Sequence, residues 1–210
     1  PALEALFTID EETGMTGALE LKGGLLNGEI LLNLDTEDDR ELTIGCAGGI
    51  DITASGSYDA DAYDRAAYKG IEIRVSGLTG GHSGMDIHLG RGNANKIMNR
   101  ILYHLDQYCS IRVENIDGGG LRNASPRESK AILAISNEEY DKVRDIVGEL
   151  HDMLMEEYET TDPNLTVSIQ DAEIVGSSMN PAFLESALRA IYACPCLLYT
   201  SPSPRDDISS

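Results

Sequence analysis

The sequence predicts an α/β protein made of two units, in which part of a mixed, largely parallel sheet is followed by a separate α+β domain. Strand-like and helix-like segments alternate in the first 50 residues, as in proteins with parallel sheets. From residue 71 onward, strands and one-faced helices follow in the order β-α-β-β-α-β. The charge changes between the two parts, because residues 1–64 hold fifteen of the 36 acidic residues but only two of the 16 Lys and Arg residues.

The first unit is expected to contain three strands and a short helix. Apolar runs predict strands at 5–9, 30–34 and 41–46, and residues 15–21 predict a helix between the first two. In parallel sheets of this kind, ligands bind at the carboxyl ends of the strands.

The second unit begins with a strand at 71–75, whose apolar and polar residues alternate strictly. A glycine-rich loop at 77–84 follows this strand. Helices are predicted where apolar residues repeat on one face, and strands where apolar runs lie between turn signals. These elements are a helix at 93–107, strands at 110–116 and 131–135, a long helix opened by a capping box at 136–139, a strand at 165–169, and a helix at 181–192 with Pro181 in its first turn.

The composition indicates an ordinary globular protein and excludes some classes of partner. The chain has 210 residues, of which 41% are hydrophobic and 25% charged, and its net charge of -20 argues against nucleic acid as a partner. No apolar run reaches the roughly 20 residues that a membrane-spanning helix needs. The four cysteines are scattered, which favours a reducing, cytoplasmic compartment over a disulfide framework.

Adjacent carboxylates follow the first two predicted strands. Asp10, Glu11 and Glu12 come directly after the run at 5–9, and Asp35 ends the run at 30–34. Carboxylates at neighbouring strand ends suit half of a zinc or hard-cation site. Such residues also form turns or cap helices, and Asp10 or Glu11 would suit a cap for the helix at 15–21. Both interpretations stay open from the residues alone.

Two further polar residues lie in glycine-rich loops. His82 is surrounded by Gly80, Gly81 and Gly84, which let a loop approach a ligand closely. Asn123 follows the glycine run at 118–120, where it would serve either a ligand or an Asx turn. Arg122 and Arg127 would suit a substrate carboxylate, although solvated or structural pairing is the more common role of such residues.

The last fifteen residues, 196–210, are expected to be a disordered, non-native tail. The segment from Cys196 resembles the in-frame translation of a sequencing adapter, and its Pro and Ser content independently predicts disorder. The expected units are therefore residues 1–51, residues 52–195 and this tail.

Six motifs in order and spacing carry a family resemblance over residues 1–195. The chain resembles the aminoacyl-histidine dipeptidases, cytosolic enzymes of the co-catalytic di-zinc exopeptidase family. The motifs are FTIDEETGMTGA from Phe7, LNLD from Leu32, GCAGG from Gly45, GGHSG from Gly80, GRGNANK from Gly90 and GGGLRNASPRE from Gly118.

The resemblance implies a role for five residues and a lid domain that forms a homodimer. Glu11 matches the general base. Glu12 and Asp35 match ligands of two zinc ions, for which cobalt or manganese can substitute. His82 matches a lid histidine that reaches the partner subunit's active site. Asn123 matches a lid residue that holds the dipeptide. A zinc-bound water would attack the scissile carbonyl while the base takes its proton.

The family's His-x-Asp motif and bridging aspartate would lie upstream of residue 1, and its last histidine ligand downstream of residue 195. We therefore expect the parent protein to hydrolyse Xaa-His and related dipeptides, and this fragment alone to be inactive. Another di-zinc exopeptidase, an N-acyl amino-acid deacylase and a non-catalytic dimerising module are the alternatives.

Overall fold

The structure, a computed structural model, describes residues 3–11, 14–34, 40, 42, 44 and 52–195. The chain divides into two compact units, residues 1–55 and residues 56–210, and each is described by itself. Within the described residues, no helix combines the length and the apolar character needed to cross a bilayer.

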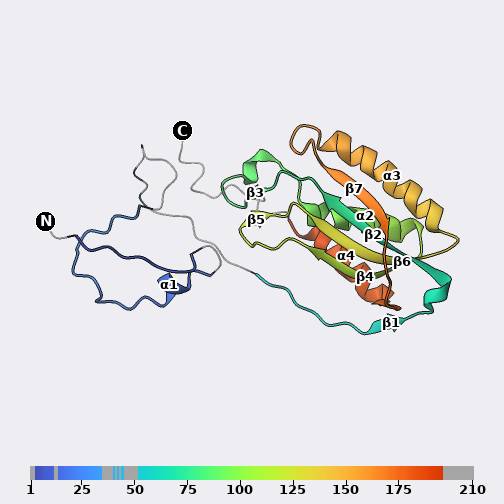
Figure 1. Cartoon of the computed structure of the whole chain (residues 1–210), viewed down its shortest axis with the longest axis horizontal. Helices are drawn as coiled ribbons and strands as arrows, with labels where there is room; N and C mark the ends of the chain where they lie inside the picture. Colours follow the sequence, from blue (N-terminus) through green and yellow to red (C-terminus); the bar gives the residue numbers. More distant parts are fainter. Residues whose placement is uncertain are drawn as a thin grey trace. The chain divides into compact units, whose positions relative to one another are not determined.

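The second unit is built on a four-stranded antiparallel sheet (Figure 1). Its strands are β2 (Tyr68–Ser76), β4 (Ile111–Gly118), β6 (Ser129–Ser136) and β7 (Thr166–Asp171). They lie in the order β4-β6-β2-β7, so the first and third strands of the sequence are the central pair. A register shift between Val113 and Asn115 interrupts the β4–β6 pairing.

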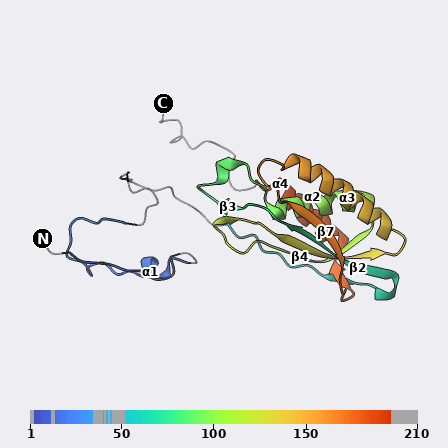
Figure 2. The ribbon, with the colours of Figure 1, turned by 45° about the horizontal axis from the view of Figure 1, so that its top comes forward.

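Three helices lie on one face of this sheet, as the two views show (Figures 1 and 2). They are α2 (Ala94–Tyr108), α3 (Tyr140–Glu157) and α4 (Pro181–Ala193). The alternation of β2 places Ile71, Ile73 and Val75 on the covered face, where they are fully buried. The apolar stripes of α2 and α3 and two leucines of α4 complete the same core.

The predicted order of elements in the second unit is confirmed, since β2, α2, β4, β6, α3 and β7 follow one another as a split β-α-β arrangement. Asn93 caps α2 by accepting the N–H groups of Asn95 and Lys96, and Asn180 caps α4. The capping box predicted at 136–139 is wrong. Ser136 is still the last residue of β6, and α3 begins at Tyr140 without a side-chain cap.

The chain between β7 and α4 crosses the sheet near one end, on the face that the helices do not cover. At Gly70 an added Cβ would lie 2.2 Å from the carbonyl oxygen of Ala172, so only glycine allows this crossing. The crossing ends in β8 (Ser177–Met179), which pairs antiparallel with β1 (Ala60–Ala62). Short 3-10 turns occupy Arg65–Ala67 and Ile87–Leu89.

A third, two-stranded sheet joins β3 (Gly81–His82) to β5 (Ala124–Ser125). β3 belongs to the connection between β2 and α2, and β5 to the connection between β4 and β6.

The first unit differs from the expected parallel sheet. Its described residues hold one short helix, α1 (Thr16–Leu19), and residues 3–11 and 30–34 form no strand. A strand exists only through hydrogen bonds to a neighbour, and no such partner is present in the described part of this unit. Phe7 is 90% exposed and Ile30 is 83% exposed, so these apolar runs are not buried as strands of a covered sheet would be.

Candidate functional site

The β3–β5 pairing places His82 beside the segment that carries Asn123. His82 lies opposite Ala124, and Gly81 lies opposite Ser125. The N–H of Ser83 donates to the carbonyl oxygen of Asn123 at 2.8 Å, which extends the ladder by one bond. Two loops that are about forty residues apart in sequence are thereby joined through their backbones.

The imidazole of His82 has one nitrogen engaged by the backbone. Its Nδ1 accepts the N–H of Gly84 at 3.1 Å and the N–H of Met85 at 3.2 Å. A neutral imidazole carries one proton, so an accepting Nδ1 leaves the proton on Nε2. The ring is exposed and presents Nε2–H as a hydrogen-bond donor.

The ion pair between Asp86 and Arg91 holds the backbone at Gly80 and His82. The Asp86 carboxylate accepts the N–H of His82 at 2.8 Å and lies 3.5 Å from the Arg91 guanidinium. Arg91 also donates to the carbonyl oxygen of Gly80 at 2.7 Å. Sequence reasoning gave no role to Asp86 or Arg91, an acid and a base that both follow the glycine-rich loop at 77–84.

Gly80 allows the two loops to meet. Its φ of 67° lies in the left-handed region, and an added Cβ would lie 2.6 Å from Cγ of Arg127. The backbone before His82 therefore packs directly against a side chain of the β5–β6 segment.

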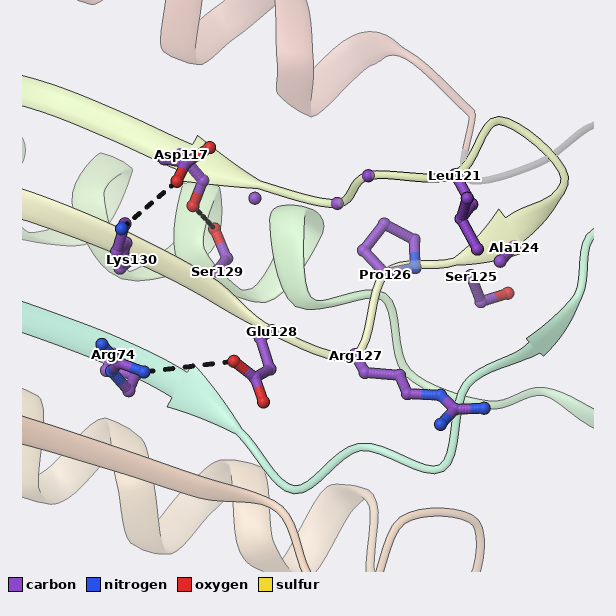
Figure 3. A pocket seen from close by; sticks show the side chains of 13 residues that line it. Arg74, Asp117, Leu121, Ala124, Ser125, Pro126, Arg127, Glu128, Ser129 and Lys130 are labelled. Atoms are coloured by element: carbon purple, nitrogen blue, oxygen red, sulfur yellow. Dashed lines mark hydrogen bonds and ion pairs between the residues drawn. The ribbon is translucent and has the colours of Figure 1, made fainter. Parts of the chain in front are cut away.

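A pocket of about 540 Å³ lies under the β4–β6 connection (Figure 3). Residues 117–121 and 124–130 line it together with Arg74 of β2. Lys130 pairs with Asp117 at 3.3 Å, and Arg74 lies 4.0 Å from Glu128. Arg127 also lines the pocket, so its charged side chains are three cations and two anions. The pocket therefore has a positive net charge, whereas the chain as a whole is strongly acidic. His82 and Asn123 are not among its lining residues.

Glu11 lies in a closed turn of the first unit. The N–H of Gly17 donates to the carbonyl oxygen of Ile9 at 3.2 Å, and a Cβ on Gly17 would lie 2.6 Å from the nitrogen of Ile9. Asp10 supports the turn, because its carbonyl accepts the N–H groups of Gly14 and Met15 and its carboxylate accepts the Thr16 hydroxyl. Glu11 itself is exposed.

The structure brings two of the five predicted site residues together. His82 and Asn123 meet at the β3–β5 pair, whereas Glu11 belongs to the other unit. Glu12 and Asp35, the predicted zinc ligands, lie outside the described residues. Within the described ranges, no group of three or more His, Cys, Asp or Glu side chains is placed to hold a metal ion.

Comparison with known proteins gives a consistent relationship. Residues 73–162 match the family of peptidase dimerisation domains, M20_dimer. Over 193 residues the chain is 35% identical to the cytosol non-specific dipeptidase of Escherichia coli strain K12, covering 92% of the chain and 40% of that protein.

A solved structure agrees with this result. The aminoacylhistidine dipeptidase from Vibrio alginolyticus shares 38% identity with a TM-score of 0.70, over 90% of this chain and 38% of that one. The chain thus spans about 40% of the length of the relatives it matches. It is a homologue of the cytosol non-specific and aminoacylhistidine dipeptidases, and it carries the M20 peptidase dimerisation domain.

Proposed function

We propose that the complete protein carrying this sequence is a metal-dependent dipeptidase that hydrolyses Xaa-His and related dipeptides in the cytoplasm. The two dipeptidase relatives support the reaction class and the compartment, since both are dipeptidases by name and one is named for the cytosol. The observation that carries the proposal is the β3–β5 pair, which joins the backbone of the loop that carries His82 to the segment that carries Asn123. These are the two lid residues that the sequence resemblance assigns to substrate.

In this proposal His82 stabilises negative charge that develops on the substrate. The backbone bonds to Nδ1 leave Nε2–H as the donor, which is the group that an oxyanion requires. Asn123 would hold the substrate through its side-chain amide, which can both donate and accept. Glu11 would take a proton from the attacking water and deliver it to the departing amine.

The metal requirement rests on the resemblance to the di-zinc exopeptidases and on two residues of the sequence. Zinc prefers about four ligands in each site, and Glu12 and Asp35 are the ligands that this chain would contribute. The remaining ligands would be the His-x-Asp motif, the bridging aspartate and the late histidine that the family resemblance implies for the complete protein. We expect a chelator to abolish dipeptide hydrolysis by the complete protein, and added zinc, cobalt or manganese to restore it.

The test of the proposed roles is steady-state dipeptide hydrolysis by the complete protein and its variants. Glu11→Ala is expected to lower kcat by about 10²–10⁴-fold, as removal of a general base does. His82→Ala is expected to lower kcat by about 10²–10³-fold, the usual effect of losing one oxyanion donor. His88→Ala is the matched control, because this exposed histidine lies in the same loop. Normal turnover in Glu11→Ala or His82→Ala would contradict the role of that residue.

A second candidate function is a dimerising module without catalysis, and the match of residues 73–162 to a dimerisation domain favours it. The two candidates differ in the complete protein, where only the enzyme hydrolyses a panel of dipeptides. The same panel, extended to N-acyl amino acids, separates a dipeptidase from a deacylase. In either case we propose that the chain forms a homodimer through its second unit.

A further inference from the structure

A single buried carboxylate binds both ends of the loop that carries His82, which is the segment 80–91. These two ends, at Thr79 and Gly92, form the neck of the loop. Asp162 lies in the turn between α3 and β7 and is only 1% exposed. One carboxylate oxygen accepts the N–H of Thr79 at 2.7 Å, and the other accepts the N–H of Gly92 at 2.7 Å. The Thr79 hydroxyl adds a bond to the carbonyl oxygen of Thr161 at 3.0 Å. Both ends of the segment 80–91 are thereby tied to one turn.

The position of Asp162 is itself fixed by the core. Its N–H donates to the carbonyl oxygen of Tyr158 at 2.8 Å, and its own carbonyl accepts the N–H of Leu165 at 2.9 Å. Tyr158 is the C-cap of α3, and Leu165 is the buried residue directly before β7. The bond from Gly92 is buried and the bond from Thr79 is partly buried. Breaking the Gly92 bond therefore leaves a buried donor without a partner.

A short series of bonds leads from this neck to the His82 ring. Arg91, the neighbour of Gly92, donates to the carbonyl oxygen of Gly80 and pairs with Asp86. Asp86 accepts the N–H of His82. Asp162 therefore sets the distance between the two ends of the loop. That distance determines whether the Arg91 guanidinium can reach the carbonyl oxygen of Gly80.

We propose that Asp162 is a positioning residue for His82. Asp162 binds the N–H groups of Thr79 and Gly92 with one carboxylate. It thereby keeps the loop in the conformation in which the N–H groups of Gly84 and Met85 donate to Nδ1 of the His82 ring. Asp162 acts through His82 and contacts no substrate. The inference rests on the proposed role of His82, which assigns a catalytic purpose to that ring.

Hydrogen exchange of the whole chain with Asp162→Asn tests the proposal without any activity measurement. An asparagine has one accepting oxygen, and its NH₂ group would face the second N–H, so one of the two neck bonds is lost. Well below the unfolding temperature, we expect protection of the Gly84 and Met85 amides to fall by at least about tenfold. The ¹⁵N signals of the His82 ring are expected to move toward those of a mixed-tautomer imidazole.

Two matched variants separate positioning from general destabilisation. Val143→Ala truncates a fully buried residue in the first turn of α3, so it lowers global stability without touching the loop. Asp152→Asn makes the same chemical change at a side chain that is 87% exposed. The proposal is overturned if Asp162→Asn lowers Gly84 and Met85 protection no more than Val143→Ala does.

Thr79→Val provides a second test that keeps the buried carboxylate in place. This substitution removes only the hydroxyl bond to Thr161 at an exposed residue, so the chain is expected to fold normally. A smaller loss of Gly84 and Met85 protection, at an unchanged unfolding midpoint, supports the proposal. Unchanged protection in both Thr79→Val and Asp162→Asn overturns it.

Kinetics of the complete protein then distinguish this inference from the proposed function. Asp162→Asn is expected to lower kcat while leaving KM within about twofold, because His82 is proposed to act on the transition state. If His82→Ala hydrolyses dipeptides normally, the proposed function of His82 fails, while the exchange data still decide whether Asp162 positions the ring.

Discussion

Glu114 shows how one side chain holds the crossing segment of the second unit. Its carboxylate accepts the Tyr63 hydroxyl and the N–H groups of residues 175–177. Burial raises the pKa of the Glu114 carboxyl, but these hydrogen bonds outweigh burial and hold the pKa below its usual value. The pKa of Tyr63 is raised, first by burial and then by the bond to Glu114 and its charge.

The lowered pKa makes a prediction about acid stability. A carboxyl whose pKa is depressed in the folded state stabilises the fold above its unfolded pKa of 4.5, and this contribution is lost as the pH falls through the folded value. We expect Glu114→Gln to lower the free energy of unfolding by about 1–3 kcal/mol at pH 7. Denaturant unfolding of both proteins should show this difference shrinking below pH 4.5, and a constant difference would contradict it.

At the scale of one element, Lys96 determines how α4 ends. Its Nζ donates to the carbonyl oxygens of Ile191, Tyr192 and Cys194 at 2.6, 2.9 and 2.7 Å. These carbonyls belong to the last turn and C-cap of α4, where a helix has acceptors without partners within itself. A cation at this position also interacts favourably with the negative end of the helix dipole. Lys96 thus ties the start of α2 to the end of α4.

Lys96→Met retains most of the aliphatic side chain and removes the charge. We expect it to lower the free energy of unfolding by about 1–3 kcal/mol, because bonds from a charged donor are stronger than neutral ones. Amide exchange should rise in the last turn of α4 before it rises in α3. Lys130→Met is the control, since Lys130 pairs with an exposed carboxylate and such pairs contribute at most about 1 kcal/mol. Equal losses in the two variants would contradict the role of Lys96.

The four strands of the main sheet and the three long helices of the second unit were predictable because each one has a buried side. The alternation of β2 and the stripe of α2 follow directly from the sheet face and helix face that they bury. The start of α3 was not predictable, because the Ser136 backbone remains in the β6 ladder and cannot also begin a helix. The apolar runs of the first unit satisfy the same sequence pattern, yet without a paired neighbour they form no strand in the described residues.

The sequence singles out His82 and Asn123 as candidate residues but does not predict their arrangement. The glycines around His82 and the glycine run before Asn123 indicated two special loops. The pairing of those loops, and the buried carboxylate at the neck of one of them, depend on contacts between residues far apart in sequence, which local patterns do not encode. Thr161, Asp162 and Pro163 carry only the signal of an ordinary turn.

For the molecule as a whole, the match to a dimerisation domain leads to a prediction about association. We expect sedimentation of this chain to show a reversible monomer–dimer equilibrium at micromolar concentration. A monomer at all concentrations up to several hundred micromolar would contradict association through the second unit. Because the chain is strongly acidic, raising the salt concentration is expected to favour the dimer by screening like charges.

The β3–β5 pair also limits how these loops can vary in length. The backbone bonds set His82 against Ala124 in a fixed register, so inserting one residue before His82 would bring a different side chain opposite that position. Because the two segments run in opposite directions, a one-residue deletion before Asn123 would be needed to restore the pairing. Among relatives that retain both residues, we therefore expect a longer loop before His82 to accompany a shorter loop before Asn123.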